Sequence, residues 1–212
     1  MNDYNLLKKL CEINATSGSE HKLTSFLINH IKKNQKNWKQ VPKIYHGENF
    51  QNNIVLSFGE PKTAIFAHID SIGYTVSYNN NVVKIGGSKL ENDISLVGKD
   101  SQGNIETILK IEKDKAFVKY YRIIDRGTPL SYKVDFKLNN EYVQSAYLDN
   151  RLGVYSALKV AESLTNGVIV FSTWEEHGGG SVSYLSKFIF EKLGINKALV
   201  SDITWILSLI HI

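Results

Sequence analysis

The sequence predicts an α/β protein in which a mostly parallel sheet, flanked by helices, is interrupted by a small inserted β-barrel. Apolar runs of strand length alternate with helical patterns near both ends of the chain. The central stretch contains only short β-prone pieces separated by turn residues, and the 212 residues are enough to bury a core in such a fold. We therefore expect an α/β unit formed by residues 1–71 and 146–212, with residues 72–145 as the inserted β-rich domain.

The N-terminal segment predicts two amphipathic helices followed by two strands. Asp3 can cap the first helix. A turn over residues 16–20 precedes the second helix, where His30 lies on or near the apolar face and is expected to be a packed core residue. Strands are predicted at residues 53–58 and 63–69, on either side of a Gly-Glu-Pro turn. The apolar positions at helical spacing are Leu6, Leu7, Leu10, Ile13, Leu23, Phe26, Leu27 and Ile31.

The remaining elements follow from the change in period along the chain. In the insertion we expect strands at residues 74–78, 82–85, 105–111, 116–121 and 132–136, with asparagine- and glycine-rich turns between them. The α/β pattern returns with helices at residues 152–164 and 182–193 and strands at residues 168–174 and 198–201. Alternating strands and helices are typical of a mostly parallel sheet covered on both faces.

Composition and charge exclude several classes of protein. The net charge of +4 is small, and the basic residues are scattered, so we expect no nucleic-acid partner. No run of about 18 apolar residues occurs, so we expect no membrane span. The single cysteine, Cys11, cannot form an internal disulfide and lies among apolar residues, which predicts a buried thiol in a reducing compartment. We expect a cytoplasmic protein.

Potential metal ligands follow three apolar strands. The strand predicted at residues 63–69 contains His68 and is followed by Asp70. The strand predicted at residues 168–174 is followed by Glu175 and Glu176, and the strand predicted at residues 198–201 is followed by Asp202. A further acid, Asp149, stands directly before a predicted helix. Because ligands of α/β sheets gather at the carboxyl ends of the strands, these side chains are expected to meet at one edge. A buried carboxylate is costly unless it is paired or binds a metal.

The local spacing suits the chemistry of a metal-activated water. His68 and Asp70 are two residues apart, so in extended backbone they point the same way, and Asp70 can fix the tautomer of a metal-bound His68. Of the adjacent pair Glu175 and Glu176, one can hold a metal while the other acts as a general base. Asp149 has two oxygens with which it could bridge two ions.

Each element also has a plain structural interpretation when it stands alone. A His-x-Asp pair is common at surfaces, Glu175-Glu176 could be a solvated strand end, and the segment from Asp149 to Arg151 could be a helix cap. Four such elements in this order favour a metal site. We assign no ligand role to His21, His46, His177 or His211, and we expect His177, the nearest of them to the site, to face solvent.

In this order the motifs resemble those of the M42 metallopeptidases, which include glutamyl aminopeptidases, deblocking aminopeptidases and endoglucanase-M-like proteins. The motifs are Ser17-Gly18-Ser19-Glu20, His68-Ile69-Asp70-Ser71-Ile72-Gly73, Leu148-Asp149-Asn150-Arg151-Leu152-Gly153, Glu175-Glu176 with Gly178 to Gly180, and Ser201-Asp202-Ile203-Thr204. The resemblance covers residues 6–204. The β-rich insertion between Asp70 and Asp149 separates this family from the related M20 and M28 peptidases.

The resemblance implies a metal-dependent aminopeptidase of peptide substrates with two divalent metal ions, zinc first and cobalt or manganese as alternatives. It implies that His68 binds one ion and Asp202 the other, that Asp149 bridges them, and that Glu176 is a further ligand. Glu175 would be the catalytic base, and Asp70 would orient His68. The resemblance also implies a cis peptide bond after Asp149 and a homo-oligomer formed through the inserted domain.

Two features depart from the family pattern. Ser71 stands where the family usually has glutamate, and the family supplies a final histidine ligand well downstream of the Asp202 position. The apolar tail from Trp205 to Ile212 does not resemble the family, and His211 follows Asp202 too closely to be that ligand. We therefore expect a C-terminal truncation. Two other functions stay open on the sequence: a metal-dependent deacylase of small N-acyl substrates, and an inactive truncated scaffold.

Overall fold

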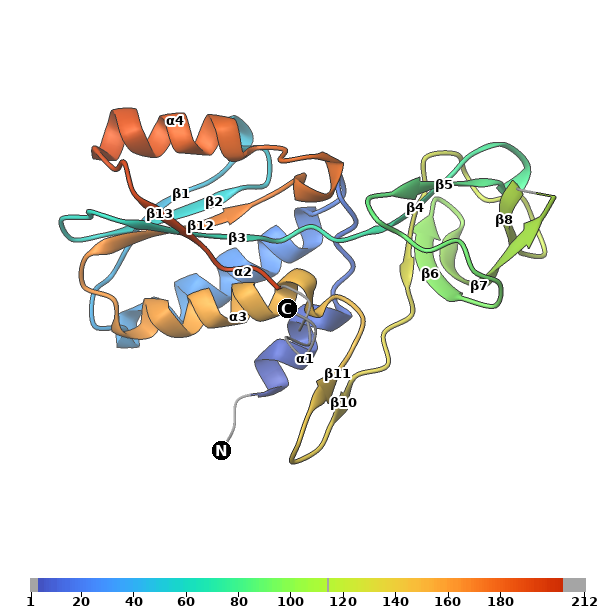
Figure 1. Cartoon of the computed structure of the whole chain (residues 1–212), viewed down its shortest axis with the longest axis horizontal. Coiled ribbons are helices and arrows are strands. Elements are labelled where there is room, and N and C mark those ends of the chain that lie inside the picture. Colours follow the sequence, from blue (N-terminus) through green and yellow to red (C-terminus); the bar gives the residue numbers. More distant parts are fainter. Residues whose placement is uncertain (1–3, 114, 204–212) are drawn as a thin grey trace, which may run out of the picture.

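A computed structural model describes residues 4–113 and 115–203 of the chain (Figure 1). The expected cap Asp3, the tail from Trp205 to Ile212 and its His211 lie outside the described residues. The described chain forms an α/β unit and a separate β-rich body connected to it by two crossings (Figure 1). Short 3-10 helices occur at η1 (Gln35–Asn37), η2 (Glu48–Phe50), η3 (Tyr78–Asn80) and η4 (Glu175–His177).

The α/β unit is built on a five-stranded sheet with the order β1-β2-β12-β3-β13. The strands are β1 (Lys43–Tyr45), β2 (Ile54–Phe58), β3 (Ala64–His68), β12 (Gly167–Ser172) and β13 (Ala198–Val200). Strand β3 pairs in parallel with both β12 and β13, whereas β1 and β2 add antiparallel at one edge and make the sheet mixed. Strand β1 was not predicted from the sequence, because it has three residues and no buried side chain.

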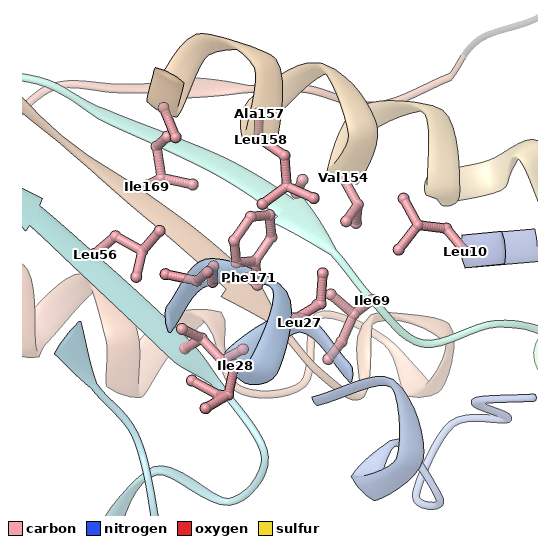
Figure 2. Packing of buried hydrophobic residues seen from close by; sticks show 14 of the residues in the cluster. Leu10, Leu27, Ile28, Leu56, Ile69, Val154, Ala157, Leu158, Ile169 and Phe171 are labelled. Carbon is pink, nitrogen blue, oxygen red and sulfur yellow. The ribbon is translucent and has the colours of Figure 1, made fainter. Parts of the chain in front are cut away.

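Helices cover both faces of this sheet. On one face lie α1 (Tyr4–Glu12), α2 (His21–Asn34) and α3 (Leu148–Ser163), and on the other lies α4 (Val182–Leu193) (Figure 1). Every residue of β12 is buried, as expected of a strand with helices on both sides. Figure 2 shows the larger core, where Phe171 of β12 lies among Leu27 of α2, Val154 of α3 and Ile69 after β3. This core fixes the direction in which the ends of β3 and β12 point.

The insertion forms a nearly closed barrel of six strands in the order β5-β4-β9-β6-β7-β8. An isolated antiparallel bridge between Asn81 and Phe117 connects the two edges of the sheet. A second core fills its interior, with Tyr74, Leu96, Leu109 and Leu130 completely buried. The strands are β4 (Gly73–Val76), β5 (Val82–Ile85), β6 (Ser95–Asp100), β7 (Gly103–Glu112), β8 (Lys115–Lys119) and β9 (Pro129–Tyr132).

Two strands of the barrel differ from the prediction. Strand β6 was not predicted, because only Leu96 of its six residues is buried and the apolar signal is weak. The strand expected at residues 132–136 lies earlier, at β9, and begins with Pro129, which a strand accepts as its first residue. After the barrel, a small hairpin of β10 (Lys137–Leu138) and β11 (Val143–Gln144) projects beside α1 and α3 (Figure 1).

No helix among the described residues combines the length and the apolar character that crossing a membrane requires.

Candidate metal centre

The parallel strands bring the predicted ligands to one edge of the sheet. His68, the last residue of β3, lies opposite Ser172, the last residue of β12, in the parallel register. The amide of Ser201, just after β13, donates a hydrogen bond to the carbonyl of Phe66 (N to O, 2.8 Å). The segments that follow these three strands, with Asp70, Glu175 and Asp202, therefore leave the sheet side by side.

His68 lies at the centre of the site and is buried, with 5% of its surface exposed. Its Nε2 lies 3.1 Å from Oδ1 of Asp149, 3.7 Å from Oδ1 of Asp202 and 3.9 Å from Oε2 of Glu175. Burial by itself would lower the pKa of His68, but hydrogen bonds with Asp149 and Asp70 and the nearby carboxylate charges raise this pKa to about 10. The imidazole therefore stands in a strongly negative environment that favours a cation.

Asp70 connects His68 to the segment that carries the two glutamates. Its Oδ1 lies 3.5 Å from Nδ1 of His68, and its backbone oxygen lies 3.1 Å from the same nitrogen. Its Oδ2 accepts a hydrogen bond from the amide of Glu176 (3.0 Å). Burial opposes ionisation, yet the pKa of Asp70 is lowered because His68, the Glu176 amide and the Ser17 hydroxyl hydrogen-bond to the carboxylate. Asp70 thus lies on the Nδ1 side of His68, while Nε2 faces Asp149.

The start of α3 places Asp149 against the end of β13. The peptide bond between Asp149 and Asn150 is cis, which confirms that expectation. The side-chain amide of Asn150 donates to the carbonyl of Ser201 (2.7 Å), and its Oδ1 accepts from the amide of Gly153 (3.0 Å). A Cβ at Gly153 would lie 2.5 Å from the oxygen of Ser201, so glycine permits this close approach. Asp149 and the segment of Asp202 are held together in this way.

The two glutamates lie on the 3-10 turn η4, which begins after Trp174 in a left-handed conformation (φ 67°). Glu175 is half-exposed and points one carboxylate oxygen toward His68. Burial, together with the charges of Asp149 and Asp70, raises the pKa of Glu176 to about 7. A Cβ at Gly86 of the barrel would lie 2.4 Å from Oε2 of Glu176, so the insertion contacts this side chain directly.

The described residues therefore bring His68, Asp149 and Asp202 into one group, whose ligand atoms all lie within 4.8 Å of one another. One imidazole and two carboxylates form a donor set suited to zinc, cobalt or manganese. The assignment of His68 and Asp202 to separate ions stays a prediction. Glu175 lies next to this group, and Glu176 lies on the side of the barrel, outside it.

The contacts of the residues that pack around η4 were not predicted from the sequence. His177, expected to face solvent, is exposed, and its Nδ1 also lies 2.6 Å from Oγ of Ser17. Glu20 is completely buried and accepts a hydrogen bond from the amide of Gly18 (2.7 Å). The motif from Ser17 to Glu20 was visible in the sequence as a turn, but nothing in its spacing indicated that it packs beneath η4.

The structural role of Arg151 was also not predicted from the sequence. Its guanidinium is completely buried and donates to the carbonyls of Ile69 and Leu10, the latter at 3.1 Å. A third contact, to the carbonyl of Ile13, measures 3.5 Å. Burial lowers the pKa of Arg151 to about 10. The side chain connects α3 to the segment after β3 and to the region of α1.

Comparisons with known proteins support the fold. No family model matches the sequence, and no curated protein matches it. Among solved structures, an aminopeptidase from the archaeon Desulfurococcus kamchatkensis is 22% identical with a TM-score of 0.76 and covers 94% of this chain. A TET aminopeptidase from a marine sediment Thaumarchaeota archaeon is 13% identical with a TM-score of 0.80 and covers 98%. The TET1 peptidase of Pyrococcus horikoshii, described as assembling into a tetrahedron or a large octahedral shell, is 19% identical with a TM-score of 0.71 and covers 93%.

This chain spans 62% of the length of the Desulfurococcus aminopeptidase, 67% of the Thaumarchaeota protein and 68% of TET1. At these identities the likeness establishes a shared fold: an α/β unit with an inserted barrel, as predicted.

Proposed function

We propose that this chain carries the catalytic centre of a metal-dependent aminopeptidase that uses two divalent cations. The observation that carries the proposal is the convergence of His68, Asp149 and Asp202 at the carboxyl edge of the sheet. The likeness in fold to aminopeptidases supports peptides as the substrate class. The activity of the whole protein is also only proposed, because this chain spans 62% of the length of the Desulfurococcus aminopeptidase.

The proposed ligand assignment is the one that the resemblance implies: His68 would hold one ion and Asp202 the other, Asp149 would serve both, and Glu176 would be a further ligand. The short distances from Nε2 of His68 to Asp149 and Asp202 support this arrangement. Zinc fits this donor set, and cobalt and manganese are the alternatives. When bound, such cations polarise the substrate carbonyl and lower the pKa of a water.

The proton transfers would be carried out by side chains of this protein. Glu175 is half-exposed and points toward His68, so it can take a proton from the attacking water and pass it to the amine that leaves. Asp70 contributes by holding the imidazole of His68, and the buried sheet edge excludes solvent from one side of the site. Cleavage of an N-terminal peptide bond needs no further acid or base.

We also propose that the chain associates with copies of itself through the barrel. The barrel exposes the large apolar side chains of Tyr78, Tyr121 and Ile123, which a monomer would leave in water. The assemblies described for TET1 support the idea by analogy. Light scattering at several concentrations measures the association, and a monomer at all of them contradicts it.

The first prediction concerns the base. Glu175→Gln removes the proton acceptor but leaves His68, Asp149 and Asp202 in place, so hydrolysis of aminoacyl anilides is expected to fall about 10²- to 10⁴-fold. Metal content, measured by inductively coupled plasma mass spectrometry, is expected to stay at the wild-type level. Glu191→Gln, on the exposed side of α4, is the matched control and keeps full activity.

A Glu175→Gln variant with wild-type turnover would contradict the base assignment. A parallel assay with N-acyl amino acids separates the peptidase from the deacylase, because only the deacylase releases the acyl group. A purified wild-type chain that binds almost no metal and cleaves neither class favours the scaffold instead.

A further inference from the structure

A side-chain contact attaches the returning crossing to the barrel just before Asp149. Tyr147 directly precedes α3 and is buried, with 6% of its surface exposed. Its hydroxyl accepts a hydrogen bond from the backbone amide of Tyr132, the last residue of β9. The two tyrosine rings also lie close together, with their centroids 5.9 Å apart. The chain is therefore held on the barrel two residues before a carboxylate of the candidate ligand group.

The hydroxyl of Tyr147 takes the place of a strand carbonyl. The amide of Lys133 donates to the carbonyl of Ser95 on β6 (2.9 Å). Because amides alternate in direction along an antiparallel strand, the amide of Tyr132 points to the other side of β9. On that side β4 pairs with β9, and among the described residues this pairing extends only as far as Leu130. Tyr147 thus supplies the acceptor that a longer β4 would otherwise provide.

The backbone around Asp149 is held on both sides. Tyr147 has a φ of 68°, which residues other than glycine rarely adopt, and its carbonyl accepts the amide of Arg151 (3.2 Å) across the turn that contains Asp149. After the turn, the side-chain amide of Asn150 donates to the carbonyl of Ser201 (2.7 Å). The side chain of Asp149 is itself 60% exposed, so packing around it does little to fix its direction. The contacts of Tyr147 and Asn150 therefore decide where the carboxylate lies.

We propose that Tyr147 is a positioning residue of the metal centre, which connects strand β9 of the barrel to the carboxylate of Asp149. Oδ1 of Asp149 lies 3.1 Å from Nε2 of His68, so a shift of the turn moves one proposed ligand relative to the other. The barrel then contributes to cation binding through this hydrogen bond, in addition to the contact of Gly86 with Glu176. The inference rests on the proposed metal centre.

The test uses cobalt as a probe on the full chain, and binding is followed by calorimetry and by visible absorption. Tyr147→Phe keeps the ring and removes only the hydroxyl that accepts the amide of Tyr132. The affinity for Co²⁺ is expected to fall about 10-fold, the lower end of the usual effect of losing the support around a metal ligand. The absorption bands of the bound cobalt are expected to change as well, because the carboxylate of Asp149 is displaced.

Tyr132→Phe is the matched control, since it makes the same chemical change in the neighbouring ring. The Tyr132 hydroxyl accepts the amide of Lys89 (3.1 Å) and lies 3.3 Å from the hydroxyl of Tyr74, so these contacts belong to the barrel. The backbone amide that donates to Tyr147 is kept. This variant is expected to lose stability and to bind cobalt as the wild type does. An equal loss of affinity in both variants would mean that any disturbance of the tyrosine rings matters, and it would overturn the positioning role.

A second measurement tests the hydrogen bond itself. Hydrogen exchange of the Tyr132 amide, followed by nuclear magnetic resonance, is expected to be slow in the wild type and faster in Tyr147→Phe, where the acceptor is missing. An amide that exchanges at the same rate in both proteins overturns the connection between Tyr147 and the barrel.

The failures can be told apart. If Tyr147→Phe binds cobalt with the wild-type affinity and spectrum, the positioning role fails while the metal centre stands. If the wild type binds no cobalt, the proposed metal centre fails, and the positioning role fails with it.

Discussion

At the scale of the residue, Arg151 combines complete burial with bonds to backbone carbonyls of separate segments. Arg151→Ala leaves these carbonyls without partners in the core, and each unsatisfied acceptor costs about 1–3 kcal/mol. The free energy of unfolding is therefore expected to fall by roughly 3 kcal/mol or more, as measured by urea denaturation. Arg126→Ala, which removes an exposed guanidinium over the ring of Tyr78, is the control and should change it by less than about 1 kcal/mol.

The contact of Gly86 with Glu176 gives a second prediction at this scale. Gly86 has a φ of +64°, and an added Cβ would lie 2.4 Å from Oε2 of Glu176 and 2.8 Å from Cγ2 of Ile72. Gly86→Ala is expected to displace Glu176 and reduce both metal content and turnover. Gly127→Ala carries the same left-handed strain, about 1–2 kcal/mol, but its Cβ meets open space. Both variants should lose stability, Gly86→Ala more because of its clash, and only Gly86→Ala should lose metal; equal metal content in both would contradict the proposed role of this contact.

How far the sequence predicted the site also depends on single residues. His68, Asp149 and Asp202 were predicted to converge because each follows or precedes an element whose apolar pattern is strong, and the structure brings them together. Ser17, His177 and Arg151 could not be identified as partners, since their contacts span 82 to 160 positions along the chain. The periodic pattern of apolar residues in the sequence carries no information on contacts between such distant positions. The catalytic roles of Glu175 and Asp70 stay predictions.

At the scale of the element, the barrel has an ion pair that makes its stability depend on pH. Arg122 donates to both oxygens of Asp100, at 2.6 and 2.9 Å, and this holds the pKa of Asp100 well below its usual range. A lowered carboxyl pKa gives stability that is present above the unfolded value of about 4 and is lost as the pH falls further. Asp100→Asn removes this contribution.

The urea midpoint of Asp100→Asn is therefore expected to lie below that of the wild type at pH 6, and the two midpoints should approach each other as the pH falls below about 4. Asp135→Asn breaks an exposed pair with Lys137 and serves as the control with little effect at either pH. A difference between Asp100→Asn and the wild type that stays constant with pH would contradict the ion-pair explanation.

The elements themselves were predictable to different degrees. Helices α2 and α4 and strands β3 and β12 follow their patterns because their buried faces are continuous. Strands β1 and β6 were missed because tertiary pairing, rather than an apolar run, makes them strands. Helix α3 begins at Leu148, four residues before the predicted start, since the backbone turn at Asp149 gives no apolar signal.

At the scale of the whole molecule, the proposed metal centre predicts that cations stabilise the fold. A ligand at about 100 times its Kd adds about 2.7 kcal/mol to the free energy of unfolding. For a chain of this length that corresponds to a rise in Tm of about 5–10 °C on adding zinc, measured by differential scanning fluorimetry. His68→Ala removes the central ligand and is expected to lose most of the rise and the metal at that position. An unchanged rise in His68→Ala would place the cation elsewhere.

The domain boundaries at residues 71–72 and 145–146 stay predictions, but the two crossings between the barrel and the sheet have a consequence of their own. The outgoing crossing starts directly behind His68, and the returning one leads into Asp149. The barrel is thus connected to the chain on both sides of the candidate ligand group, and Gly86 of the barrel also contacts Glu176. A partner that tilts the barrel would change the distance between the imidazole of His68 and the carboxylate of Asp149. Binding of a partner to the barrel would therefore change the affinity of the proposed site for a cation.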